Sequence, residues 1–83
     1  GYILRKQKRL SEAAQAYQEV LRLNPTNHQA HGNLGLVFLE QGNLPEAETQ
    51  FESALRIFPN DVIARKNLGL VRRARSERTK TPE

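Results

Sequence analysis

Apolar residues recur along this chain at the spacing of an amphipathic helix. Val37 and Phe38 lie three and four residues after Leu34. A second segment repeats this spacing with five apolar residues: Ala47, Phe51, Ala54, Leu55 and Phe58. Because an α-helix has 3.6 residues per turn, such spacing gathers the apolar side chains on one face. The pattern predicts an all-α protein.

Helix-ending and helix-starting residues divide this pattern into short elements. Asn27 and Asp61 are suitable N-caps, because their side-chain oxygens can accept a backbone N–H of the following turn. Gly42 can take the left-handed conformation that ends a helix, and Pro45 suits a first helical turn. We therefore expect two helices between residues 28 and 61.

The whole pattern repeats with a period of 34 residues. The pentapeptide NLGLV occurs at residues 33–37 and again at residues 67–71. Pro25 and Pro59 have the same separation, and each prevents a helix from continuing. The segment LSEAAQAYQEVLRLNP also aligns without a gap with LPEAETQFESALRIFP. A fixed period of this length predicts a solenoid, in which each helical hairpin is buried by its neighbours.

Small residues recur where two helices of such a stack would touch. Gly35 on the first helix of a hairpin and Ala47 on the second would let the two backbones approach closely. Gly69 and Ala13 hold the equivalent positions one period away. We expect an aromatic ring to fill the space one turn beyond each alanine.

These residues resemble the tetratricopeptide repeat family. Its motif is a 34-residue helix-turn-helix with Leu-Gly, an aromatic residue, Ala, a second aromatic residue, Ala and Pro at fixed offsets. The chain supplies all of these: Leu34, Gly35, Phe38, Ala47, Phe51, Ala54 and Pro59. It departs at the early Trp of the motif, where it has His31. The resemblance implies a helical-hairpin solenoid of about two repeats plus a C-terminal capping helix.

Four segments follow from this alignment. We expect residues 1–27 to be a truncated first repeat, with the end of one helix and a complete second helix. Residues 28–61 form the complete repeat, residues 62–76 the capping helix and residues 77–83 a flexible basic tail. Gly1 aligns with the helix-internal glycine of the motif, so we expect the chain to be the C-terminal piece of a longer repeat protein.

The last helix differs from its earlier copy in being basic. Arg72 and Arg73 stand where the first copy has Phe38 and Leu39. A buried unpaired charge costs several kcal/mol, so we expect these arginines to face water. The opposite face carries three apolar residues that we expect to pack on the stack: Val62, Leu68 and Val71.

Composition and charge narrow the function. The 83 residues include no Cys, which excludes disulfides and thiolate metal sites and suits a cytoplasmic location. No apolar run approaches the roughly 20 residues that span a bilayer, so we expect a soluble protein without a membrane partner. The net charge of +4 favours an acidic partner.

No catalytic constellation can be assembled, so we expect a protein that is not an enzyme. His28 and His31 are spaced to share a helix face, but no third metal ligand lies near them, and we expect ordinary surface histidines with no metal and no cofactor. Glu48 and Glu52 fall on exposed helix positions and are not expected to form a catalytic pair.

The resemblance implies a concave groove, lined by the first helix of each hairpin, that holds a peptide or a helix of a partner protein. The inward positions carried over from the family are Gln29, Asn33, Leu36, Glu40, Ile63, Lys66, Asn67 and Leu70, with Tyr2, Arg5 and Lys6 from the truncated helix. The amides of Asn33 and Asn67, one period apart, could hold a peptide backbone, because each offers a donor and an acceptor. The competing interpretation is that both are polar positions on a solvated surface.

The basic residues of this groove favour an acidic segment of a protein or peptide. Some family members bind the C-terminal carboxylate of chaperones with a clamp of Lys, Arg and Asn. This sequence keeps Asn33 but has Ile63 and Asn67 where the clamp needs Lys and Arg, so chaperone docking is disfavoured. Self-association through exposed ends, giving a homo-oligomer, stays open as the alternative. Nucleic acid binding is disfavoured, because the basic tail has no interleaved aromatic residues.

Overall fold

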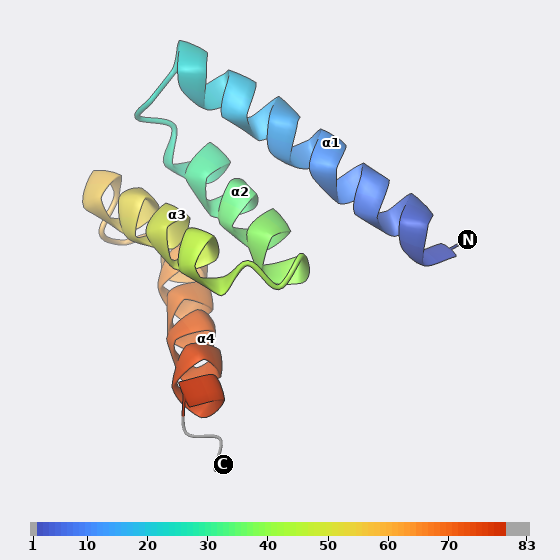
Figure 1. The fold of residues 1–83 in the computed structure, drawn as a ribbon. Coiled ribbons are helices and arrows are strands. Elements are labelled where there is room, and N and C mark those ends of the chain that lie inside the picture. The colour runs from blue at the N-terminus through green and yellow to red at the C-terminus, as the bar shows by residue number, and fades with distance from the viewer. Residues whose placement is uncertain (1, 80–83) are drawn as a thin grey trace.

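The computed structural model describes residues 2–79, which form four consecutive helices (Figure 1). These are α1 (Tyr2–Leu23), α2 (His28–Glu40), α3 (Leu44–Ile57) and α4 (Val62–Thr79). Each helix packs against the next one in the chain, and α2 also contacts α4. The predicted all-α architecture of stacked helical hairpins is confirmed.

The expected capping residues set the helix boundaries. The Oδ1 atom of Asn27 accepts the backbone N–H of Ala30 at 3.0 Å, and Oδ1 of Asp61 accepts that of Ala64 at 3.0 Å. Gly42 has a φ of 81°, the left-handed conformation that ends α2. The turns that separate α2, α3 and α4 are therefore where the sequence predicts them.

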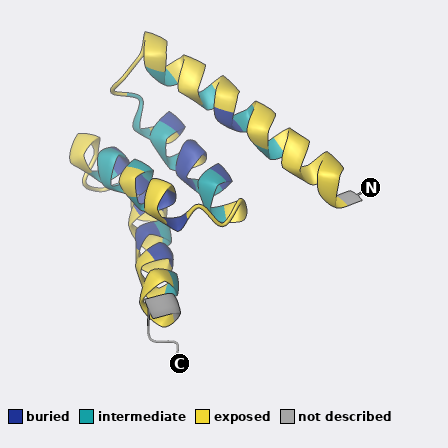
Figure 2. Ribbon diagram, viewed as in Figure 1, coloured by how far each residue is buried: buried dark blue, intermediate teal, exposed yellow. Residues whose placement is uncertain are grey.

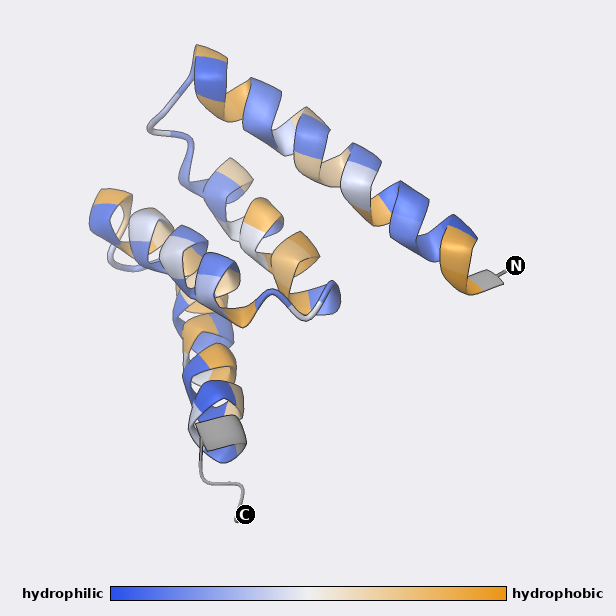
Figure 3. Ribbon diagram, in the orientation of Figure 1, coloured by the Kyte–Doolittle hydropathy of each residue, from blue (hydrophilic) through white to orange (hydrophobic). Residues whose placement is uncertain are grey.

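The core consists of two clusters, one on each side of α2. The larger cluster lies mainly between α3 and α4 and contains Leu44, Ala47, Phe51, Ala54, Ala64, Leu68 and Val71. The smaller cluster joins α1 to α2 through Ala14, Leu34 and Val37. Buried residues are concentrated on α2, α3 and α4, whereas α1 is exposed over most of its length (Figure 2). Hydropathy does not follow this division: α2 carries many hydrophobic residues, whereas α1 and α4 both mix hydrophilic and hydrophobic residues (Figure 3).

The two glycines of the NLGLV copies lie in different surroundings. A Cβ added to Gly35 would lie 2.8 Å from Cε1 of Phe51, so the predicted close approach of α2 and α3 is confirmed. A Cβ added to Gly69 would meet nothing within 4 Å. The expectation of a close helix contact at Gly69 is therefore wrong, because no described helix covers that side of α4.

The first helix also differs from the expectation. We expected a turn between the end of one helix and the start of the next within residues 1–27, but Tyr2–Leu23 is one unbroken helix. Lys8 and Ser11 stand where the next repeat has Gly42 and Pro45. Neither residue forces the backbone out of the helical region, so the helix continues through this point.

The last helix is longer than predicted and is rotated from its expected orientation. It continues to Thr79, so residues 77–79, expected in the tail, are helical, and Arg73 and Glu77 form an i,i+4 ion pair at 3.7 Å. Residues 80–83 of the expected tail lie outside the described residues. Val62 is 73% exposed, contrary to the expectation that it packs on the stack. It lies two residues before buried Ala64, which places it on the opposite side of the helix.

Candidate partner-binding groove

The helices α2 and α4 contact each other and border a hollow of about 270 Å³. Eight residues line it: His28, Gln29, Gly32, Asn33, Leu36, Asp61, Ile63 and Ala64. Four of the predicted groove residues are among them, namely Gln29, Asn33, Leu36 and Ile63. The structure therefore brings together the first part of the predicted groove.

The lining of this hollow combines apolar surface with side-chain amides. Ile63 is 67% exposed, Leu36 is half-buried and Ala64 is fully buried. The amides of Gln29 and Asn33 are exposed on α2. Apolar side chains can take up apolar groups of a ligand, while amides can donate to and accept from a peptide backbone. This mixture suits an extended polypeptide segment.

One end of the hollow is fixed by a contact that the sequence analysis missed. Nδ1 of His28 lies 2.9 Å from Oδ2 of Asp61, and the His28 ring packs on Phe58 with its centroid 4.9 Å away. The contact joins the first residue of α2 to the N-cap of α4. Its two residues are 33 positions apart, so no local pattern in the sequence indicates it.

These contacts lower the pKa of the Asp61 carboxyl. Burial alone would raise its pKa, but the hydrogen bonds from the Ala64 N–H and from His28 outweigh burial. The pKa of Asp61 therefore lies below its ordinary value, and the group is an anion near neutral pH. Both of its oxygens already have partners, His28 on Oδ2 and the Ala64 N–H on Oδ1.

The remaining predicted residues of α4 extend beyond the hollow. Lys66 and Leu70 are exposed and Asn67 is half-buried, and none of the three belongs to the lining of the hollow. The predicted pairing of Asn33 with Asn67 as one binding surface is therefore not established by the geometry, and it stays a prediction.

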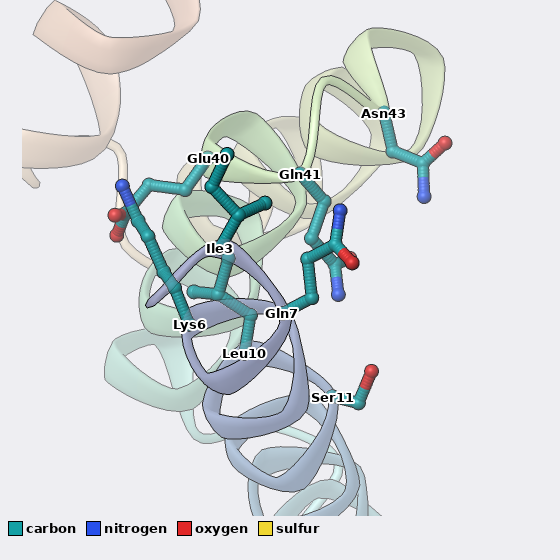
Figure 4. A pocket seen from close by; sticks show the side chains of 8 residues that line it. All are labelled: Ile3, Lys6, Gln7, Leu10, Ser11, Glu40, Gln41 and Asn43. Atoms are coloured by element: carbon teal, nitrogen blue, oxygen red, sulfur yellow. The ribbon is translucent and has the colours of Figure 1, made fainter. Parts of the chain in front are cut away.

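The predicted groove residues of α1 belong to a different hollow. Lys6 and Glu40 line a space of about 590 Å³ between the first half of α1 and the end of α2. Lys6 and Glu40 extend on one side of this space, and Gln7 and Gln41 lie on the other (Figure 4). Arg5 is exposed on α1 outside this lining, and the side chain of Tyr2 lies outside the described part of the chain. The predicted groove is thus divided in two, because α1 continues as a straight helix.

His31, at the motif position of Trp, makes contacts that join α2 to neighbouring parts of the chain. Its Nδ1 lies 2.8 Å from Oε1 of Gln50 on α3, and its Nε2 lies 3.1 Å from the backbone oxygen of Pro25. These contacts hold α2 to α3 and to the preceding loop. Within residues 2–79 no group of three or more potential metal-ligating side chains occurs.

Arg72 and Arg73 are exposed, as the sequence predicts, but Arg72 also forms ion pairs that the sequence analysis did not anticipate. Its Nε lies 3.2 Å from Oε2 of Glu48, and its Nη2 lies 3.1 Å from Oε2 of Glu52. Arg75 also pairs with Glu48, whose side chain is only 18% exposed. Glu48 and Glu52 are half-buried, contrary to the expectation that they fall on exposed helix positions, and the three pairs join α3 to α4.

Pairing changes the titration of Glu48. The hydrogen bond from Arg75 lowers its pKa, burial raises it, and the contact with Arg72 lowers it further. The net result is a pKa below the ordinary value, so the carboxylate stays charged into mildly acidic solution.

The fold is a helical-repeat scaffold. A family model described as tetratricopeptide repeat matches residues 1–62 and again residues 33–77. The chain therefore belongs to the tetratricopeptide repeat family. Repeats of this family typically act as non-catalytic modules of protein–protein interaction. A search of curated proteins finds no match to the chain. None of the helices described here is long and apolar enough to cross a membrane.

Proposed function

We propose that this chain is a non-catalytic module that binds an extended segment of a partner protein in the hollow between α2 and α4. The observation that carries the proposal is the composition of this hollow, where two exposed amides on α2 lie beside the apolar surface of Leu36 and Ile63. Backbone amides of an extended segment need hydrogen-bond partners, and Gln29 and Asn33 can supply them. Apolar side chains of the same segment can lie on Leu36 and Ile63.

The charge beside the hollow favours an acidic partner. Lys66 is exposed on α4 one turn beyond Ile63, and Asp61 at the other end is already paired with His28. Lys66 is therefore an exposed positive charge on the α4 side, and rim charges of this kind mainly select partners and speed association. A cytoplasmic location and the absence of catalysis are parts of the same proposal.

Self-association is the second candidate and would use other surfaces. Ile3 and Leu4, at the exposed start of α1, are each 69% exposed. These apolar residues lie outside the hollow between α2 and α4. A dimer formed through them would leave binding in the groove unaffected.

The test compares two double variants in a peptide selection. The chain is used to select from a displayed library of random 12-residue peptides, and the selected peptides are measured against Asn33→Ala, Gln29→Ala. The control is Gln15→Ala, Gln18→Ala, which removes two exposed amides from α1. We expect the groove variant to weaken binding by roughly tenfold or more and the control to leave it unchanged. Equal binding by both variants would contradict the proposal, and a mass that rises with protein concentration would favour the second candidate.

A further inference from the structure

Gly32 leaves an open notch in the wall of the hollow between α2 and α4. A Cβ added at this position would meet nothing within 4 Å, although Gly32 lies in the interior of α2. One period later the equivalent position is occupied by Lys66, whose side chain is long. The notch therefore belongs to this one repeat and is not a feature of the repeat pattern.

The other glycines show that the fold does not explain Gly32. Gly35 is required by the close approach of Phe51, and Gly42 by its positive φ. Gly32 has neither constraint, and glycine inside a helix costs stability relative to alanine. Gly69 is equally unconstrained, but it lies outside the lining of the hollow. What distinguishes Gly32 is that the space above it opens onto exposed apolar surface.

The size and chemistry of the hollow indicate what it can hold. Its volume of about 270 Å³ is just below the roughly 300–1,000 Å³ of sites for small molecules and cofactors, so it suits one side chain with its backbone. Its exposed apolar lining is aliphatic and comes from Leu36 and Ile63. The only carboxylate in the lining, Asp61, already accepts hydrogen bonds on both oxygens. A cationic side chain would therefore find no free anion there.

We propose that the notch over Gly32 is a specificity pocket that takes one branched aliphatic side chain, Leu, Ile or Val, of the bound partner segment. This inference rests on the proposed function, because it assumes that the segment lies between α2 and α4. In this arrangement Gln29 and Asn33 hold the backbone of the segment, and the aliphatic side chain enters between Leu36 and Ile63. The acidic residues favoured by Lys66 would then lie beside the anchoring residue.

The test fills the notch with a side chain of the protein itself. In Gly32→Leu a side chain of the chain itself occupies the space, whereas Gly69→Leu places the same side chain on the open outer side of α4. Both variants replace an unconstrained helical glycine, so both should retain the circular dichroism spectrum of the wild type. The probe is the set of 12-residue peptides selected by the wild-type chain, together with copies in which their aliphatic anchor is replaced by Ser.

We expect the selected peptides to share one position restricted to Leu, Ile or Val. Gly32→Leu should weaken their binding by roughly tenfold or more, and Gly69→Leu should change it by less than about twofold. The Ser copies should bind the wild type weakly but lose little further affinity for Gly32→Leu, since the two changes remove the same contact.

Two outcomes would overturn the inference in distinguishable ways. If Asn33→Ala, Gln29→Ala weakens binding but Gly32→Leu and the Ser replacement act additively, the segment lies in the groove and the notch is not its anchor. If the selected peptides bind all of these variants equally, or no peptide is selected, the proposed function fails together with the inference.

Discussion

The helices α1 and α3 hold equivalent positions in successive repeats, yet they are buried to very different extents. On α3, Ala47, Phe51 and Ala54 are completely buried. On α1 the equivalent Tyr17 is only half-buried and the equivalent Val20 is 39% exposed. The reason is that α3 packs against both α2 and α4, whereas α1 packs against α2 alone. The extent to which an apolar side chain of the repeat is buried therefore depends on how many helices pack against its own helix.

The contacts between hairpins also differ in kind. Ala14 of α1 is buried in the apolar cluster with Leu34 and Val37 of α2. One period later the equivalent of Ala14 is Glu48, which pairs with Arg72 and Arg75 of α4. Equivalent positions in two successive repeats can therefore join neighbouring helices in different ways, by apolar packing in one and by ion pairs in the other.

The largest expected difference in the free energy of unfolding is between variants of the equivalent aromatic residues Phe51 and Tyr17. Phe51→Ala should lower the free energy of unfolding by about 3–5 kcal/mol, because it leaves a cavity at a fully buried position. Tyr17→Ala should cost about 1–2 kcal/mol, since its half-buried ring gains less from burial. Urea denaturation followed by circular dichroism measures both. Equal costs would show that α1 is covered as completely as α3, contrary to the structure.

A second comparison uses the two glycines of the NLGLV copies. Gly35→Ala should destabilise the fold by about 1–3 kcal/mol, because the added methyl group would lie 2.8 Å from the buried Phe51 ring. Gly69→Ala should stabilise it by about 0.5–1 kcal/mol, because it meets open space and improves helix propensity. Thermal unfolding of the two variants tests the difference in sign. A destabilising Gly69→Ala would mean that another helix packs on α4.

The smallest expected effect concerns the ion pairs that hold α4. The pKa of Glu48 is lower in the folded chain than its ordinary value of 4.5, so its pairing stabilises the fold above about pH 4.5. This contribution is lost as the pH falls through the folded pKa. The stability difference between wild type and Glu48→Gln should therefore be present at pH 7 and shrink in acid. Glu12→Gln on α1, which removes an exposed charge, is the matched control, and a pH-independent difference would contradict the account.

Most of the fold could be predicted because the repeat specifies it with local signals. Gly42 takes the predicted left-handed conformation, and Asn27 and Asp61 cap the helices they precede. The unbroken α1 could not be predicted by this route. The alignment placed a turn near Lys8, but neither that residue nor its neighbours imposes one on the backbone.

The site was predicted less completely, because it depends on how the helices are oriented. Repeat register placed Asn33 and Ile63 on the side where α2 and α4 meet, and the structure brings both into one hollow. The contact of His28 with Asp61 depends on the packing of residues 33 positions apart, and no sequence pattern encodes it. The notch at Gly32 was missed because the motif attaches no meaning to that position. Its contrast with Lys66 one period later was the signal available in the sequence.

The most direct test of the groove between α2 and α4 is an NMR titration of the isotope-labelled chain with a peptide selected from the random library. The account predicts that the largest chemical-shift changes occur at the side-chain amides of Gln29 and Asn33 and at the methyl groups of Ile63. Changes concentrated at Ile3 and Lys6, in the hollow between α1 and α2, would contradict it and place the binding site there.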